Sequence, residues 1–190
     1  AQLHNIKVVG ESASADSDAA KSFPQNLKKI IDDEGYTPQQ VFNVDETGLF
    51  WKRMPGRTFI SKEERLAAGP KVSKDRLTLL LGGNAAGDFK LKPLLIYKSE
   101  TPRAMKNVCK ENLPVIWMSN KKAWMTSKLF NDWFTTHFCP EVKKYCERNN
   151  LSYKALLVID NAPGHTITLN NMNDNINVLF LPPNTTSLIQ

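Results

Sequence analysis

The pattern of apolar and polar positions predicts two helical regions in the chain. Apolar residues recur at helical spacing from Ala19 to Ile31, and Gly35 is suited to the position after the last helical turn. This first helix either runs through Pro24 or begins there, since proline is unfavourable inside a helix. A second helix is predicted after Ser127, and its aromatic stripe is typical of a buried face. The stripe comprises Leu129, Phe130, Trp133, Phe134 and Phe138, and Pro140 breaks or kinks the helix beyond it.

Five apolar segments predict strands, and their order predicts an α/β fold. They are residues 41–45, 77–81, 91–97, 155–160 and 176–181. Residues 46–48 are expected to turn the chain after the first strand, and residues 85–88 to join the second and third strands as a hairpin. The run 155–160 is apolar throughout, which is typical of a strand covered by helices on both faces. We therefore expect a mixed sheet with an antiparallel hairpin, later parallel strands and flanking helices.

The length and the charge of the chain add only a little to the prediction of its fold and partner. The 190 residues suit one domain, which we place at 17–190. Residues 1–16 are small and polar, so we expect a linker or the edge of a fragment there. No run of about 18 apolar residues is present, so no membrane-spanning helix is expected. The net charge of +6 is compatible with a nucleic-acid partner.

Two aspartates, Asp45 and Asp160, each end a predicted strand and precede a turn. Ligands of α/β sheets collect beyond the carboxyl ends of strands, so the two carboxylates would converge if their strands are neighbours. Converging carboxylates favour a hard cation such as Mg²⁺ or Mn²⁺. An aspartate in this position also commonly starts a turn or caps a helix, and spacing alone leaves both interpretations open.

Four segments in order resemble the DDE superfamily endonuclease domain of pogo/Tigger-type DNA transposases, a group that includes the jerky and centromere protein B relatives. The segments are Val41–Leu49, Lys74–Thr78, Val158–His165 and Phe180–Ser187, and the resemblance runs from about Ser22 to the end. It implies a ribonuclease-H-like fold, α/β with a mixed sheet and flanking helices. It also implies that Asp45 and Asp160 are catalytic metal ligands for two-metal phosphodiester hydrolysis and strand transfer.

The same resemblance implies a third carboxylate that follows the Leu-Pro-Pro-Asn-Thr-Thr-Ser segment. Asp174 is the only acid after Asp160, and it precedes the last predicted strand, so it does not match that role. We therefore expect a domain truncated at its C-terminal side, with Mg²⁺ or Mn²⁺ bound only weakly. Whether the chain acts as an enzyme is left open. The alternative is a domesticated, non-catalytic module that binds nucleic acid or protein.

The remaining expectations concern supporting residues and partners. His165 orients a carboxylate, touches a phosphate or only makes a structural turn bond. Asn161 either supports the metal or shapes the turn. Basic residues cluster after the first aspartate, where DNA contact and a solvated loop are both open. The candidates for DNA contact are Arg53, Arg57, Lys71, Lys74 and Arg76. The resemblance implies DNA as the partner, the nucleus as the location and a homo-oligomer as a possible state of the full-length protein.

Overall fold

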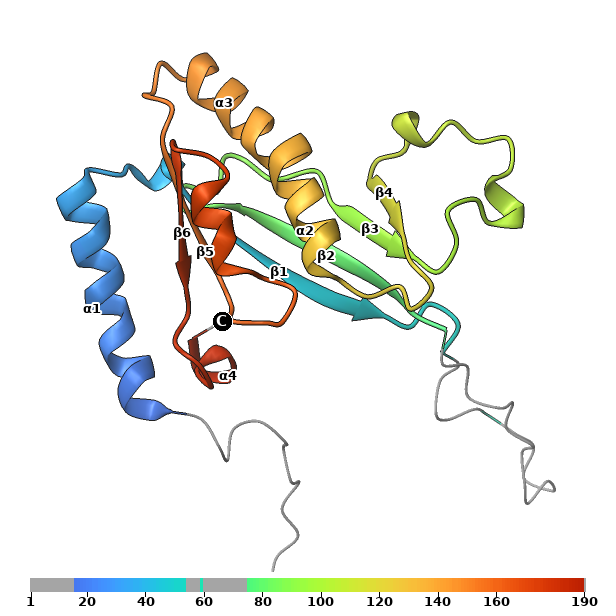
Figure 1. The fold of residues 1–190 in the computed structure, drawn as a ribbon, viewed down its shortest axis with the longest axis horizontal. Coiled ribbons are helices and arrows are strands. Elements are labelled where there is room, and N and C mark those ends of the chain that lie inside the picture. The colour runs from blue at the N-terminus through green and yellow to red at the C-terminus, as the bar shows by residue number, and fades with distance from the viewer. Residues whose placement is uncertain (1–15, 54–58, 60–74, 190) are drawn as a thin grey trace, which may run out of the picture. The chain divides into compact units, whose positions relative to one another are not determined.

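The computed structural model describes residues 16–53, 59 and 75–189, and these form a mixed six-stranded sheet with flanking helices. The strand order is β4-β3-β2-β1-β5-β6. The strands are β1 (Val41–Leu49), β2 (Leu77–Asn84), β3 (Leu94–Tyr97), β4 (Ile116–Ser119), β5 (Ala155–Ile159) and β6 (Ile176–Phe180). The pairs β1–β5, β5–β6 and β3–β4 are parallel, whereas β2 and β3 are antiparallel. The predicted mixed α/β sheet is thus confirmed (Figure 1).

The helices are α1 (Ser17–Glu34), α2 (Ser127–Trp133), α3 (Cys139–Arg148) and α4 (Thr186–Ile189). Short 3₁₀ turns lie at Pro38–Gln40, Arg103–Met105, Lys110–Asn112 and Ile167–Asn171, and a π-helical segment, Phe134–Phe138, joins α2 to α3. In the part of the chain that the structure describes, no helix is both long and apolar enough to cross a membrane.

The structure departs from the sequence-based expectation in four strands. β2 continues three residues past Leu81 to Asn84, and β3 begins at Leu94 rather than at Leu91. β1 continues to Leu49, so the turn expected at residues 46–48 is wrong, and that segment stays extended in the strand. Strand β4 was not predicted. It has only four residues, and all of them are half-buried, so it shows no alternation of buried and exposed positions for a pattern to detect.

The chain divides into two compact units. The first unit comprises residues 1–45, 82–91 and 126–190, and the second comprises residues 46–81 and 92–125. The division falls inside β1 and inside β2, so each of these strands begins in one unit and ends in the other. The predicted domain 17–190 therefore contains two units, and most of the predicted linker 1–16 lies outside the described residues.

In the first unit, helices pack on both faces of the sheet. Val41 lies in an apolar cluster with Phe23 of α1, whereas its neighbour Phe42 meets Phe138 edge-on at 5.5 Å between ring centroids. Consecutive strand residues point to opposite faces, so α1 covers one face and the segment leading into α3 covers the other. All five residues of β5 are buried, as expected of a strand covered on both faces (Figure 1).

Local chemistry explains the helix boundaries. Asp16 caps α1 by accepting hydrogen bonds from the backbone N–H groups of Asp18 and Ala19, and Gly35 ends it in the left-handed conformation at φ 63°. Pro24 lies inside α1, so the expectation that the helix begins there is not met. Helix α2 is capped by the Thr126 hydroxyl rather than by Ser127, which is the first helical residue.

Candidate metal and nucleic-acid site

The parallel pairing of β1 with β5 aligns the two predicted catalytic aspartates. Val41 pairs with Leu156, Phe42 with Leu157 and Asn43 with Val158. The same register, continued two residues past Asn43, places Asp45 level with Asp160. Asp160 directly follows the last residue of β5, whereas Asp45 lies in the middle of β1, which continues to Leu49, so the expectation that Asp45 ends its strand is wrong. The two strands are neighbours and run in the same direction, so the two aspartates are still level with each other.

A side-chain hydrogen bond joins β1 and β5 two residues before the aspartates. The amide of Asn43 donates to the backbone oxygen of Val158 at 2.9 Å. On the other side of β5, the backbone N–H of Leu181 donates to the carbonyl oxygen of Ile159 at 2.8 Å. The backbone leading into Asp160 is therefore held from both neighbouring strands. Sequence reasoning missed Asn43, although its position two residues before Asp45 was a signal.

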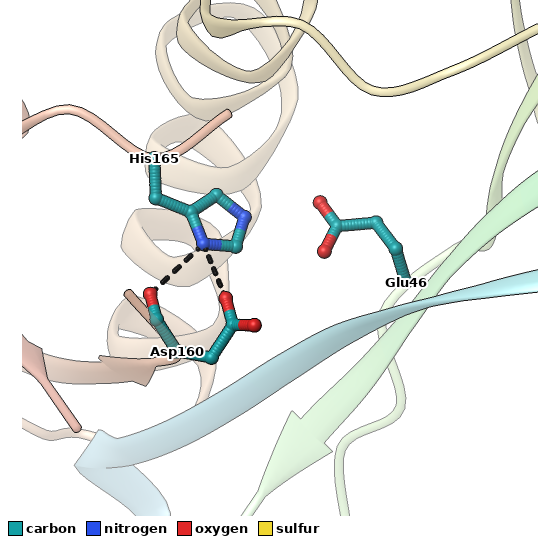
Figure 2. Close-up of side chains that lie close together, drawn as sticks. All are labelled: Glu46, Asp160 and His165. Atoms are coloured by element: carbon teal, nitrogen blue, oxygen red, sulfur yellow. Dashed lines mark hydrogen bonds and ion pairs between the residues drawn. The ribbon is translucent and has the colours of Figure 1, made fainter. Parts of the chain in front are cut away.

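Asp160 is paired with His165, which lies five residues further along the chain (Figure 2). The Nδ1 atom of His165 lies 2.7 Å from the carboxylate Oδ1 of Asp160 and 3.0 Å from its carbonyl oxygen. A carbonyl oxygen only accepts, so Nδ1 carries the proton and donates it toward both oxygens. The hydrogen bond from His165 is the main cause that lowers the pKa of Asp160, and partial burial opposes it.

Two backbone N–H groups stabilise the turn from residue 160 to 165 that carries this pair. The backbone N–H of Ala162 donates to Oδ1 of Asp160 at 3.3 Å, and the N–H of His165 donates to the Ala162 carbonyl at 2.9 Å. The His165 side chain is 1% exposed and packs on Phe130 of α2, with ring centroids 4.3 Å apart. The histidine therefore makes a structural turn bond and contacts the carboxylate at once. Whether the carboxylate contact or the turn bond is the important one stays a prediction.

An open pocket of about 350 Å³ lies beside Asp160, entirely within the first unit. Its lining comprises Asp160, Asn161, Pro182, Pro183, Asn184, Thr186 and Ser187. The turn that supplies most of this lining follows β6, and the Thr185 hydroxyl donates to the Pro182 carbonyl at 2.6 Å to close it. Asn161 is exposed and faces this pocket, so its amide oxygen is available as a further ligand.

Two other acids, Asp174 and Glu46, follow the two predicted catalytic aspartates in the sequence. Asp174 comes just before β6, whose first residue, Ile176, pairs with Ala155 at the start of β5. It therefore lies at the opposite end of these strands from Asp160, as the sequence indicated. Glu46, also labelled in Figure 2, follows Asp45 in β1 and is the first residue of the second unit.

Two of the predicted DNA-contacting residues, Arg53 and Arg76, are described by the structure, and both belong to the second unit. Arg53 is exposed. The guanidinium of Arg76 lies over the Trp124 ring, 4.1 Å from its centroid. The other three candidates, Arg57, Lys71 and Lys74, lie outside the described residues.

The strand order defines the class of fold, a mixed six-stranded α/β sheet in which Asp45 and Asp160 are level on neighbouring parallel strands. Residues 74–190 match the family described as DDE superfamily endonuclease. The chain belongs to this family.

Two curated relatives match nearly the whole chain. The human Jerky protein homolog is 37% identical over 192 residues, which cover 98% of this chain and 34% of that protein. Human Tigger transposable element-derived protein 7 is 37% identical over 196 residues, which cover 99% of this chain and 35% of that protein. The chain thus spans about a third of the length of these relatives.

The fold is similar to that of a solved transposase. The structure titled "Crystal structure of the Mos1 mariner paired end complex with Mn" matches 97% of this chain and 48% of that chain, with a TM-score of 0.53 and 11% sequence identity. At that identity the likeness shows the fold alone, and it agrees with the ribonuclease-H-like sheet that the sequence resemblance implied.

Proposed function

We propose that this chain is the metal-binding catalytic core of a transposase-derived protein that acts on DNA in the nucleus. Asp45, within β1, and Asp160, at the carboxyl end of β5, hold a divalent cation, Mg²⁺ or Mn²⁺. The observation that carries the proposal is the parallel register that brings the two aspartates level. Membership of the DDE superfamily endonuclease family supports divalent-cation chemistry at these positions.

The residues present suit a hard cation. Asp160 has a lowered pKa, so its carboxylate is ionised at neutral pH and can act as a ligand. Carboxylate and amide oxygens are the donors that Mg²⁺ and Mn²⁺ prefer, and Asp45, Asp160 and Asn161 supply such oxygens. When bound, divalent cations at such a site polarise a phosphodiester and generate a nucleophile from water.

The protein residues have separate tasks in this proposal. Asp45 and Asp160 supply negative charge, and His165 keeps the Asp160 carboxylate in one orientation by donating to it from a buried ring. Asn43 fixes the spacing of the two strands below the aspartates. Arg53 and Arg76 neutralise DNA phosphates, which positions the backbone without reading its sequence.

We further propose that residues 1–190 alone bind the cation weakly and cut DNA poorly or not at all. The family resemblance implies a third carboxylate, and Asp174 lies at the wrong end of the strands to supply it. The full-length protein is expected to cleave DNA in the presence of Mg²⁺. If it binds Mg²⁺ and DNA but leaves plasmid DNA intact, the alternative of a domesticated, non-catalytic binding module is favoured instead.

The test is Mn²⁺ binding measured by electron paramagnetic resonance on the 190-residue chain. Asp45→Ala and Asp160→Ala should each weaken binding by at least about 10-fold, because each removes a charged ligand. Asp174→Ala is the matched control and should bind as the unchanged chain does. Equal binding by all four proteins would refute the proposed site.

A further inference from the structure

A second hollow, of about 430 Å³, lies within the second unit and combines positive charge with an exposed aromatic ring. We call it the Trp124 hollow. Its lining comprises Phe50, Asp75, Arg76, Lys98, Lys121, Lys122, Ala123 and Trp124. We propose that it binds an unpaired nucleotide of DNA, with the base stacked on Trp124 and the phosphate held by Lys121 and Lys122. The inference rests on DNA being the partner of the proposed function, and it assigns a separate contact.

The Trp124 side chain is placed to stack on a ligand. Trp124 is 55% exposed, which is unusual for the largest apolar side chain. The guanidinium of Arg76 lies over the ring, 4.1 Å from its centroid, and supports it. Aromatic rings of this kind serve as platforms for nucleic-acid bases, and cationic arginine adds to the attraction.

The backbone that presents Trp124 is held rigidly. Ala123 adopts the left-handed conformation at φ 51°, which costs energy for any residue other than glycine. The buried hydroxyl of Thr78 donates to the Ala123 carbonyl at 2.7 Å, and the Asn120 side chain accepts from the N–H of Trp124 at 3.2 Å. A strained but fixed loop of this kind pre-organises the ring, so little conformational entropy is lost on binding.

The charge in the hollow suits a phosphate. Four cationic side chains line it, against the single carboxylate of Asp75. That carboxylate is already engaged, 2.7 Å from Lys52 and 3.1 Å from Lys98, and the hydrogen bond from Lys52 is the main cause that lowers its pKa. Lys121 and Lys122 are exposed next to the ring. An acidic peptide would pair with the cationic side chains of the hollow, but it would leave the exposed Trp124 ring without a stacking partner.

An unpaired base is required because bases inside a duplex have no free face for the ring. The hollow should therefore prefer single-stranded DNA over a blunt duplex, and it should need the bases as well as the phosphates. Trp51 offers a matched control. It is 49% exposed in the same unit and has Lys52 over its ring, but it does not line the hollow.

The experiment measures fluorescence anisotropy of a labelled oligothymidylate with the 190-residue chain, in EDTA and at low salt. Trp124→Ala should weaken binding about 10-fold, Trp124→Phe should retain most of it, and Trp51→Ala should change it less than about 2-fold. An abasic strand of equal length should bind the unchanged protein about as weakly as oligothymidylate binds Trp124→Ala. Exchange of Lys121 and Lys122 for alanine should reduce the slope of log affinity against log salt by about 1.4.

Three results would overturn the proposal: unchanged affinity in Trp124→Ala, equal binding of the abasic strand, or equally effective competition by polyglutamate. Circular dichroism checks that each variant is folded, and Trp124→Phe keeps the test valid if the alanine variant is not. The assay contains EDTA, so no divalent cation is present and the proposed metal site does not contribute to the measured affinity. Failure of the metal site and failure of the Trp124 hollow are therefore observed separately.

Discussion

His165 donates from one buried nitrogen to both the carboxylate and the carbonyl oxygen of Asp160, at 2.7 and 3.0 Å. The first of these bonds orients the side chain of a proposed metal ligand, and the second closes the turn that carries it. Residues that orient a ligand commonly contribute 10–100-fold to metal affinity.

The first prediction is that His165→Phe weakens Mn²⁺ binding about 10-fold, because the ring is kept beside Phe130 but the donor is lost. His165→Gln, which restores an N–H donor, should recover part of that loss. Isothermal titration calorimetry at pH 7 measures both affinities. If His165→Phe binds Mn²⁺ like the unchanged chain, the histidine is needed only for the turn.

The second prediction concerns Gly82, where β2 passes very close to β1. A Cβ atom at this position would overlap the backbone oxygen of Asn43 and the side chain of Val44. Gly82→Ala should therefore lower the free energy of unfolding by about 1–3 kcal/mol, since the strands must move apart. Gly48→Ala is the control, because its nearest neighbour would be an ordinary contact at 3.7 Å. Urea denaturation compares the two, and equal midpoints would contradict the close packing of β1 and β2.

The third prediction is a pH dependence at Asp88. Its carboxylate accepts from the Asn84 amide at 2.7 Å and from the Tyr145 hydroxyl at 2.9 Å. The bond from Asn84 is the main cause that lowers the pKa of Asp88. A carboxylate with a lowered folded pKa stabilises the fold above its unfolded pKa of about 3.9, and this contribution is lost as pH falls through the folded value.

Asp88→Asn should therefore be less stable than the unchanged chain at pH 6–8, and the difference should shrink below about pH 4. Thermal unfolding at several pH values measures it. Asp33→Asn, at an exposed position of α1, is the control for the removal of one carboxylate. A difference for Asp88→Asn that is independent of pH would show that the charge of Asp88 is not involved.

The fourth prediction separates the three thiols. Cys109 is exposed, whereas Cys139 and Cys146 are buried, and burial raises the pKa of the Cys139 thiol to about 12. Only thiolates react quickly with Ellman's reagent, so one thiol should react in the native chain and three after denaturation. Cys109→Ser should abolish the native reaction. Rapid labelling of two or more thiols in the folded protein would contradict the buried positions.

Much of the fold could be predicted because the apolar runs are long and bounded by turn residues. The five buried residues of β5 and the aromatic stripe ahead of α3 are examples. Strand β4 could not be found, because it is short and half-buried throughout. Thr47 and Gly48 predicted a turn, but β1 continues through them to Leu49. The tertiary context of the sheet therefore outweighed the local turn propensity of these residues.

The candidate site was predicted only in part. Asp45 and Asp160 were singled out because each follows an apolar run, although β1 in fact continues past Asp45 to Leu49. Nothing local shows that the two strands are neighbours, because residue pairing across more than a hundred positions is a tertiary property. The resemblance supplied that adjacency, and the register confirms it. The hydrogen bond from Asn43 to Val158 joins segments that are distant in the sequence. Lys121, Lys122 and Trp124 are close together in the sequence, but the hollow also needs Arg76 and Phe50, and that grouping is a tertiary property.

The central claim, that Asp45 and Asp160 share a divalent cation, is tested most directly by iron-mediated backbone cleavage. Fe²⁺ replaces Mg²⁺ at oxygen-ligand sites, and with ascorbate and peroxide it cuts the polypeptide next to its ligands. The account predicts cuts near residue 45 and near residue 160, both suppressed by excess Mg²⁺ and both lost in Asp160→Ala. Cuts at only one of these segments, or cuts that excess Mg²⁺ does not suppress, would contradict it.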